Sequence, residues 1–278
     1  MSKSEPLIDF RWPVLSSGYE WIDATIPRDV EDESVRLLTE WRRPDAARTM
    51  VDPFATDCLF RLFAELEPTE DAVETFADQF GLLGHPVMMG AKAGGDKIVG
   101  EPIDRWASQI KRMQAAVGLW DFVQADDFAG IEQAISAGVP SVPWGRSIGT
   151  AWHSLMDETA IGADYAAQRM HGWQVAQALK YIRNQINAGL ANCVEPKLGW
   201  DPDGGRLRLN VAPASLIGAI WLQFAFAVDS DARFRRCDTC GTWFSIAPPK
   251  RESRKYCSDA CRTRAYRERH TTKESTDE

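Results

Sequence analysis

Apolar residues recur every three or four positions through most of the first 228 residues, which is the spacing of one face of an α-helix. Residues 70–80 give the clearest case, with apolar side chains on one predicted face: Val73, Phe76, Ala77 and Phe80. Thr69 precedes them with a hydroxyl that can cap the first turn, and Gly81 follows where a helix can end. The pattern therefore predicts a capped helix over residues 70–80.

Three further segments keep the helical period, at residues 53–67, 103–120 and 175–186. Pro102 stands directly before the second of them, at a position that helices tolerate. Residues 86–100 contain several glycines and no helical period, so we expect a connector there.

The periodicity changes after residue 190. Residues 206–211 alternate polar and apolar, which is the period of a half-buried β-strand. Residues 201–205 have the composition of a tight turn, and residues 194–200 precede them as a second strand. A hairpin followed by a strongly apolar helix over residues 216–227 is therefore expected.

Together these patterns predict a mainly α fold, in which a helical amino-terminal domain with a small β-hairpin spans residues 1–228. Hydrophobic residues form 44% and charged residues 26% of the 278 residues, the balance of a globular protein. The longest apolar stretch, residues 211–228, contains polar residues and is shorter than the roughly 20 residues of a membrane-spanning helix. We therefore expect a buried helix there and no contact with a membrane.

Four of the six cysteines lie near the carboxyl end in two close pairs. Cys237 and Cys240 form the first pair and Cys257 and Cys261 the second, with sixteen residues between the pairs. Zinc prefers four soft ligands in a tetrahedron, which two such pairs supply. No secretory signal is apparent, so we expect a cytoplasmic, reducing setting in which spaced cysteines bind metal. The ligand set alone leaves iron open, and four unlinked thiols are the simpler alternative.

The residues around the first pair have the order of a treble-clef-like zinc finger, which we place at residues 229–270. The first pair suits a tight knuckle, in which Gly241 can adopt a positive φ. Residues 243–246 are largely apolar and can form a hairpin closed by a loop at residues 248–251. A module this short has little apolar surface of its own, so the metal is expected to stabilise it.

The second pair fits a helix that carries two ligands. Cys257 and Cys261 are four residues apart, so a helix would direct both sulfur atoms toward one metal. Ser258 can cap this helix and place its positive end beside the thiolates.

The residues around the cysteines resemble those of the CGNR-type zinc-finger proteins. The resemblance lies in Arg235-Arg236-Cys237, Cys240-Gly241, Phe244, Arg254-Lys255-Tyr256-Cys257-Ser258 and Cys261-Arg262-Thr263-Arg264-Ala265. The four-residue signature reads Cys-Arg-Thr-Arg here, without its Gly and Asn. The resemblance implies an ABATE-like amino-terminal domain whose last hairpin and apolar helix, similar to residues 190–228, lead into the finger. It also implies a bacterial transcription regulator whose finger contacts nucleic acid.

Charge is distributed unevenly along the chain, whose net charge is −8. Residues 233–270 carry +7, residues 1–232 carry −13, and residues 271–278, where we expect an acidic disordered tail, carry −2. An acidic body repels polyanions while a basic end attracts them.

Eight basic side chains are the predicted contacts to nucleic acid, with DNA favoured over RNA. They are Lys250, Arg251, Arg254, Lys255, Arg262, Arg264, Arg267 and Arg269. Arginines on the last helix would fall on sides other than that of the cysteines, and could therefore reach phosphate groups. The sequence thus predicts a zinc-binding transcription regulator with a basic carboxyl-terminal finger.

Two other functions stay open at this stage. The basic side chains can instead face solvent or dock on the acidic body, which describes a protein-interaction or structural module whose finger caps the helical domain. The helical domain can also hold a protein partner. An enzyme sited in the helical body is the weaker third option, and we expect none: the glycine-rich residues 90–97 lack the lysine placement of a phosphate-binding loop.

Overall fold

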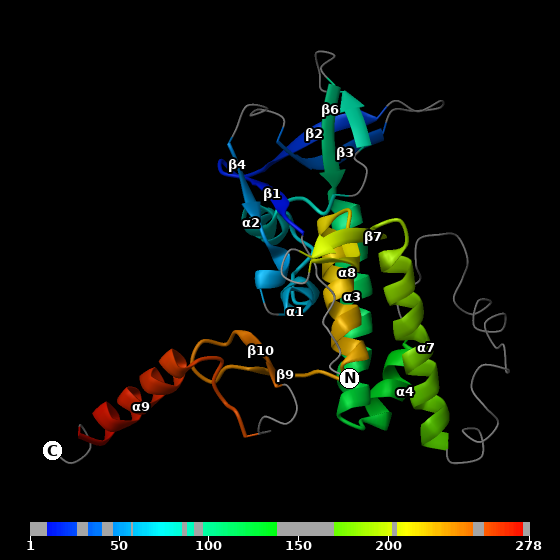
Figure 1. The fold of residues 1–278 in the computed structure, drawn as a ribbon. Coiled ribbons are helices and arrows are strands. Elements are labelled where there is room, and N and C mark those ends of the chain that lie inside the picture. The colour runs from blue at the N-terminus through cyan, green and yellow to red at the C-terminus, as the bar shows by residue number, and fades with distance from the viewer. Residues whose placement is uncertain are drawn as a thin grey trace.

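The computed structural model describes residues 10–26, 33–40, 47–56, 58–84, 88–91, 97–137, 170–201, 205–246 and 253–274. These residues form ten β-strands and seven α-helices, in a mixed α/β fold (Figure 1). The prediction of a mainly α fold is therefore wrong. The error lies chiefly in the first 102 residues, where strands form several small sheets.

A small β-barrel occupies this amino-terminal region. Its strands are β2 (Glu20–Ile26), β3 (Glu33–Thr39), β6 (Lys97–Pro102) and β5 (Met88–Ala91), hydrogen-bonded in that order and closed between β5 and β2. A separate antiparallel pair joins β1 (Trp12–Leu15) to β4 (Arg48–Val51). The expected connector at residues 86–100 thus contains β5 and part of β6 instead.

The barrel strands are hard to recognise in the sequence because burial hides their period. Leu37 and Leu38 are adjacent in β3, so they point to opposite faces, yet both are fully buried. Leu37 packs with Ile22 and Ala24, whereas Leu38 belongs to the main core. Gly100 lies where a Cβ atom would be 2.7 Å from the carbonyl oxygen of Leu38, so this glycine permits close strand pairing.

The helices carry the main core. They are α1 (Leu59–Ala64), α2 (Glu70–Phe80), α3 (Ile103–Gln124), α4 (Phe128–Ser136), α7 (Met170–Leu190), α8 (Leu216–Asp229) and α9 (Asp259–Glu274). The predicted capped helix is confirmed as α2, where the Thr69 hydroxyl accepts from the amide of Ala72 at 3.4 Å. The single helix predicted over residues 53–67 is wrong: a 3₁₀ turn, η1 (Pro53–Ala55), precedes α1, and Cys58 between them has a φ of 66°.

The most apolar helix, α8, is buried on nearly all sides. It contacts α1, α7 and η1, and its side chains Ile217, Ile220 and Trp221 are inaccessible to solvent. The predicted hairpin before it is confirmed as β7 (Val194–Asp201) paired with β8 (Arg206–Pro213). Within the described ranges, no helix combines the length and the apolar character needed to cross a bilayer.

A buried carboxylate joins the barrel to the helices. Glu101, in β6, is 2% exposed and accepts hydrogen bonds from the backbone amides of Leu83 at 2.9 Å and Gly84 at 2.7 Å. These two residues follow α2, so the carboxylate ties the chain just after that helix to β6 and supplies an acceptor for the amide of the buried Leu83.

Replacing Glu101 with Ala should destabilise the whole fold. Two amides lose their acceptor, and we expect the free energy of unfolding to fall by roughly 2–4 kcal/mol. Urea denaturation followed by circular dichroism measures this change. Glu67→Ala, which removes an exposed carboxylate, is the matched control and should change stability by less than about 0.5 kcal/mol. Equal effects of the two substitutions would contradict a joining role for Glu101.

Candidate metal centre

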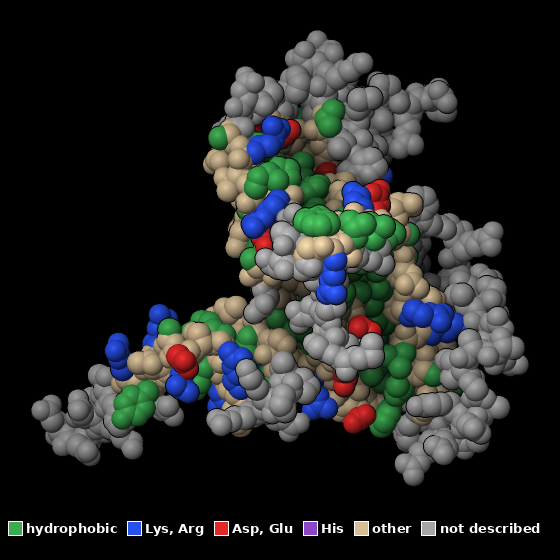
Figure 2. Space-filling view, in the orientation of Figure 1, with side chains coloured by type: hydrophobic (Ala, Val, Ile, Leu, Met, Phe, Trp, Pro, Cys, Tyr) green, Lys and Arg blue, Asp and Glu red, His purple; other side chains and the backbone are tan. Residues whose placement is uncertain are grey.

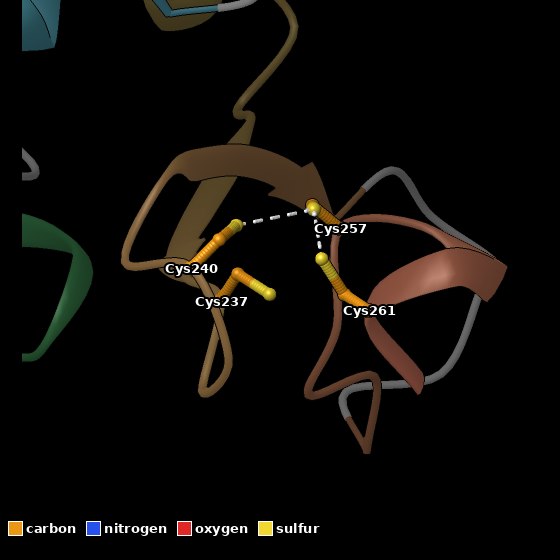
Figure 3. Close-up of side chains that lie close together, drawn as sticks. All are labelled: Cys237, Cys240, Cys257 and Cys261. Atoms are coloured by element: carbon orange, nitrogen blue, oxygen red, sulfur yellow. Dashed lines mark hydrogen bonds between the residues drawn. The ribbon is translucent and has the colours of Figure 1, made fainter. Parts of the chain in front are cut away.

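The first cysteine pair sits in a knuckle that reverses the chain. Strand β9 (Arg233–Arg236) ends directly before Cys237, and β10 (Trp243–Ile246) begins soon after Cys240. The amide of Cys237 donates to the Thr242 carbonyl at 3.0 Å, and Gly241 has a φ of 70°, a conformation that favours glycine. The turn therefore presents both sulfur atoms on one side of the hairpin (Figure 3).

The hairpin differs from the one predicted. We expected residues 243–246 to pair across a loop at residues 248–251, but β10 pairs with β9, on the other side of the knuckle. The physical reason is that the knuckle itself supplies the reversal. Residues 247–252 lie outside the described residues.

The second pair lies at the start of α9, but the helix predicted to carry both ligands carries only Cys261. Cys257 precedes the helix and Cys261 is in its first turn. The Ser258 hydroxyl accepts a hydrogen bond from the amide of Cys261 at 3.3 Å, which confirms the expected cap. Helix α9 continues to Glu274, so the tail predicted from residue 271 begins within it, and residues 275–278 lie outside the described residues.

The four sulfur atoms lie within 4.8 Å of one another. The Sγ atom of Cys257 is 3.6 Å from that of Cys240 and 3.6 Å from that of Cys261 (Figure 3). A tetrahedral zinc ion with bonds of about 2.3 Å holds its sulfur ligands about 3.8 Å apart. The four cysteines therefore fit a metal ion with a preference for thiolates.

The surroundings affect the four thiols unequally. Burial opposes ionisation of Cys237, but hydrogen bonds from the backbone amides of Cys257, Cys240 and Thr239 outweigh it and lower the pKa of this thiol to about 6. Burial, and next the neighbouring thiols of Cys261 and Cys240, raise the pKa of Cys257 to about 12. To bind a metal, all four thiols must lose their protons, and the resulting thiolates would repel one another. A bound divalent cation would offset this repulsion with its own positive charge.

Two hydrogen bonds join the knuckle to the segment that contains the second cysteine pair. The amide of Asp238 donates to the carbonyl of Lys255 at 3.1 Å, and the Thr239 hydroxyl donates to the carbonyl of Cys261 at 3.1 Å. Sequence reasoning missed Thr239, although a hydroxyl between two close cysteines is a usable indication of such a clamp. Hydrogen bonds therefore hold the two segments together beside the cluster of sulfur atoms.

The predicted phosphate contacts have different surroundings. Exposed side chains on or beside α9 are Lys255, Arg262, Arg264 and Arg267. Arg254 stacks on Phe244, 4.9 Å from the ring centre, and donates to the carbonyl oxygens of Tyr256 and Cys257. Lys250, Arg251 and the side chain of Arg269 lie outside the described part of the chain.

A hollow of ≈ 720 Å³ opens in front of the amino end of α9. Its lining includes three basic residues, Arg254, Lys255 and Arg262, and one acidic residue, Asp259. Arg262 pairs with Asp259 at 3.1 Å, which is an ion pair within α9 itself. The hollow is therefore a mixed but mainly cationic surface.

The finger contacts the helical body at Arg61 of α1. The Arg61 side chain is almost fully buried, binds both carboxylate oxygens of Asp121 at 2.6 and 2.9 Å, and lies 4.4 Å from the ring centre of Trp243. Glu65, one turn later, accepts hydrogen bonds from Arg236 and, at 2.8 Å, from the Trp243 indole. We call this contact the Arg61–Glu65 seam. No pattern in the sequence predicts this contact.

Comparisons with known proteins add no relative to this description. No protein-family model matches the chain, and neither the curated proteins nor the solved structures include a match. The resemblance to the CGNR-type proteins therefore stays a prediction from its motifs.

Replacing Cys257 with Ser should remove the metal and unfold the finger. Cys257 is within 3.6 Å of two other sulfur atoms, so its loss breaks the tetrahedron. We expect one metal ion per chain in the unaltered protein by elemental analysis, and less than about a tenth of that in the variant. Helical circular dichroism of the body should change little.

Cys58→Ala provides the control, because Cys58 is a buried thiol in the body, outside the sulfur cluster. It should retain the full metal content. Less than half an equivalent of metal in the unaltered chain, purified without chelator, would argue against the centre.

Proposed function

We propose that this protein is a zinc-dependent nucleic-acid-binding protein, and specifically a cytoplasmic transcription regulator that contacts DNA through its carboxyl-terminal finger. The observation that supports the proposal is that Arg262, Arg264 and Arg267 are exposed on two sides of α9, a helix that projects away from the body (Figure 1). The role is binding rather than catalysis. The resemblance to the CGNR-type zinc-finger proteins supports the same function.

Helix α9 meets the geometric needs of a phosphate-binding element. Arg262, Arg264 and Arg267 are exposed on it, and Lys and Arg side chains gather over the finger and this helix in Figure 2. Guanidinium groups bind phosphate oxygens through pairs of donors, which fixes the position of a duplex without reading its sequence. A helix can also enter the major groove, where arginine recognises guanine.

Metal binding would orient this helix relative to the rest of the finger. Two ligands lie on α9 or directly before it, and the other two lie in the knuckle after β9. Four thiolates with one zinc ion add a charge of about −2, so residues 233–270 would stay near +5. The acidic body, residues 1–232, would keep the duplex away from itself and direct it toward the finger.

DNA binding should depend on salt and on the three exposed arginines of α9. For the unaltered protein we expect the affinity for a duplex to fall steeply between 50 and 200 mM salt. The triple variant with Arg262→Ala, Arg264→Ala and Arg267→Ala should bind at least about tenfold more weakly. The slope of log affinity against log salt concentration should fall by the amount that corresponds to about three phosphate contacts. Fluorescence anisotropy with a labelled duplex measures both quantities.

The matched control removes three exposed basic residues from the body: Arg105→Ala, Lys111→Ala and Arg183→Ala combined. It makes the same change in net charge and should leave the affinity within about twofold, because it changes only long-range attraction. A flat salt response of the unaltered protein, or equal losses in both triple variants, would reject the DNA-binding proposal.

The Arg61–Glu65 seam favours a second candidate, in which the finger is a structural cap on the helical body. Phe234 and Trp243 of the finger pack against the main core, and Arg236 is bound to Glu65. Some of the finger's basic side chains thus serve the body rather than a partner. A protein partner on the helical domain would be compatible with this candidate.

Trp243→Ala tests the cap. It removes the ring over Arg61 and the donor to Glu65, so we expect a loss of roughly 1–2 kcal/mol in stability. This corresponds to a fall of about 2–8 °C in the melting temperature, measured by calorimetry. Trp173→Ala, which removes an exposed tryptophan from α7, should have almost no effect. An unchanged melting temperature for Trp243→Ala would exclude the cap.

A further inference from the structure

One side of the β7–β8 hairpin presents apolar side chains to solvent. Alternate residues of β7 point to the same side, and the residues of β8 directly opposite them share it. Five residues form this hairpin face: Pro196, Leu198, Trp200, Leu207 and Val211. Leu198 is 70% exposed, and Trp200 and Leu207 are each 62% exposed. Figure 2 shows a run of hydrophobic side chains where β7 lies in Figure 1.

The other side of the hairpin is polar and is exposed as well. There the side chains of Lys197 and Glu195 form an ion pair at 3.3 Å and are 61% and 62% exposed. The hairpin contacts α8, and a hydrogen bond from the Ala214 amide to the Cys193 carbonyl at 2.8 Å holds its base. Because both sides of β7 face solvent beyond this base, the hairpin forms an arm with one apolar and one charged side.

Exposure of the hairpin face is unfavourable. Two strands alone are marginally stable in water, and within the described ranges β7 and β8 pair only with each other. The three most exposed side chains leave about 400 Å² of apolar surface in water, which is enough to mark an interaction surface. None of the five residues of the hairpin face is charged, so a complementary surface is apolar rather than acidic or basic.

The bulk of the hairpin face changes along the strands. Trp200 and Leu207 lie opposite each other at the end near the turn, and Pro196 and Val211 lie opposite each other toward the body. Four residues of a strand separate the two ends by about 13 Å, with Leu198 halfway between them. The hairpin face is thus bulky at its tip, smaller at its base and apolar throughout.

Such a gradient is complementary to itself in a second copy related by a two-fold axis. An axis that lies between two hairpin faces, perpendicular to the strands, places the tip of one face over the base of the other. Trp200 then lies over Pro196 of the second copy, and Leu198 lies over Leu198 of the second copy. Large side chains thus meet small ones, as in well-packed interfaces, whereas a tip-over-tip arrangement would set the bulky ends against each other.

We propose that the hairpin face joins two copies of this protein in a face-to-face dimer. The two faces together bury about 800 Å², an area at the lower end for protein interfaces and typical of weak, reversible contacts. We therefore expect a dissociation constant in about the micromolar range or above. The dimer goes beyond the proposed function and does not depend on it, because neither the finger nor nucleic acid takes part in the contact.

Sedimentation velocity of the full chain without DNA, over concentrations from about 1 to about 300 µM, tests the dimer. We expect the weight-average sedimentation coefficient to rise with concentration toward that of a dimer. Trp200→Ala should weaken association at least about tenfold, because it removes the largest side chain of the hairpin face. Trp173→Ala, which removes an exposed tryptophan from α7, is the matched control and should leave association unchanged. A monomer at every concentration, or equal losses in both variants, overturns the proposal.

A charge exchange at Leu198 distinguishes a second copy from a different apolar partner. Leu198→Glu and Leu198→Lys each bring two like charges together at the two-fold axis, so each variant alone should be monomeric. An equimolar mixture of the two should associate at least about tenfold more tightly than either variant alone, since opposite charges then meet. Lys197→Gln makes the same change in net charge as Leu198→Glu, on the other side of β7, and should still dimerise. A mixture that stays monomeric, or a Leu198→Glu dimer as stable as that of the unaltered chain, overturns the proposal.

Discussion

Four sulfur atoms within 4.8 Å of one another are the constraint on which the carboxyl-terminal part of this protein depends. They come from two segments sixteen residues apart, a knuckle and the start of α9. The hairpin β9–β10 is too small to form a core of its own, so a metal shared by the four cysteines would supply the missing stabilisation. The orientation of α9, and with it that of the exposed arginines, follows from the same ligands.

The basic residues of the finger divide into two groups with different roles. Arg236 is bound to Glu65 of the body, and Arg254 holds backbone carbonyls beside Cys257, so both side chains stabilise the finger or its seat. Arg262 and Arg264 are exposed on α9, where phosphate can reach them. The proposed structural cap and the proposed DNA contact can therefore coexist, because they use different side chains.

Helix α3 connects the two unusual features of the body. Its Asp121 binds Arg61 at the Arg61–Glu65 seam, and its Arg112 donates to the amide oxygen of Gln185 in α7. The two arginines differ in one respect. Arg61 has a carboxylate partner, whereas the described residues that bond Arg112 are neutral amides.

The sequence by itself determined the features that depend on local spacing. The capped helix at Thr69, the hairpin before α8 and the paired cysteines are all set by residues within one or two turns of each other, so period and spacing reveal them. Only the tertiary structure decided the rest. The barrel strands could not be recognised in the sequence because β3 is buried on both faces. The seam and the contact between Arg112 and Gln185 join residues about 60 or more positions apart. Such contacts are created by chain folding, and no local period records them.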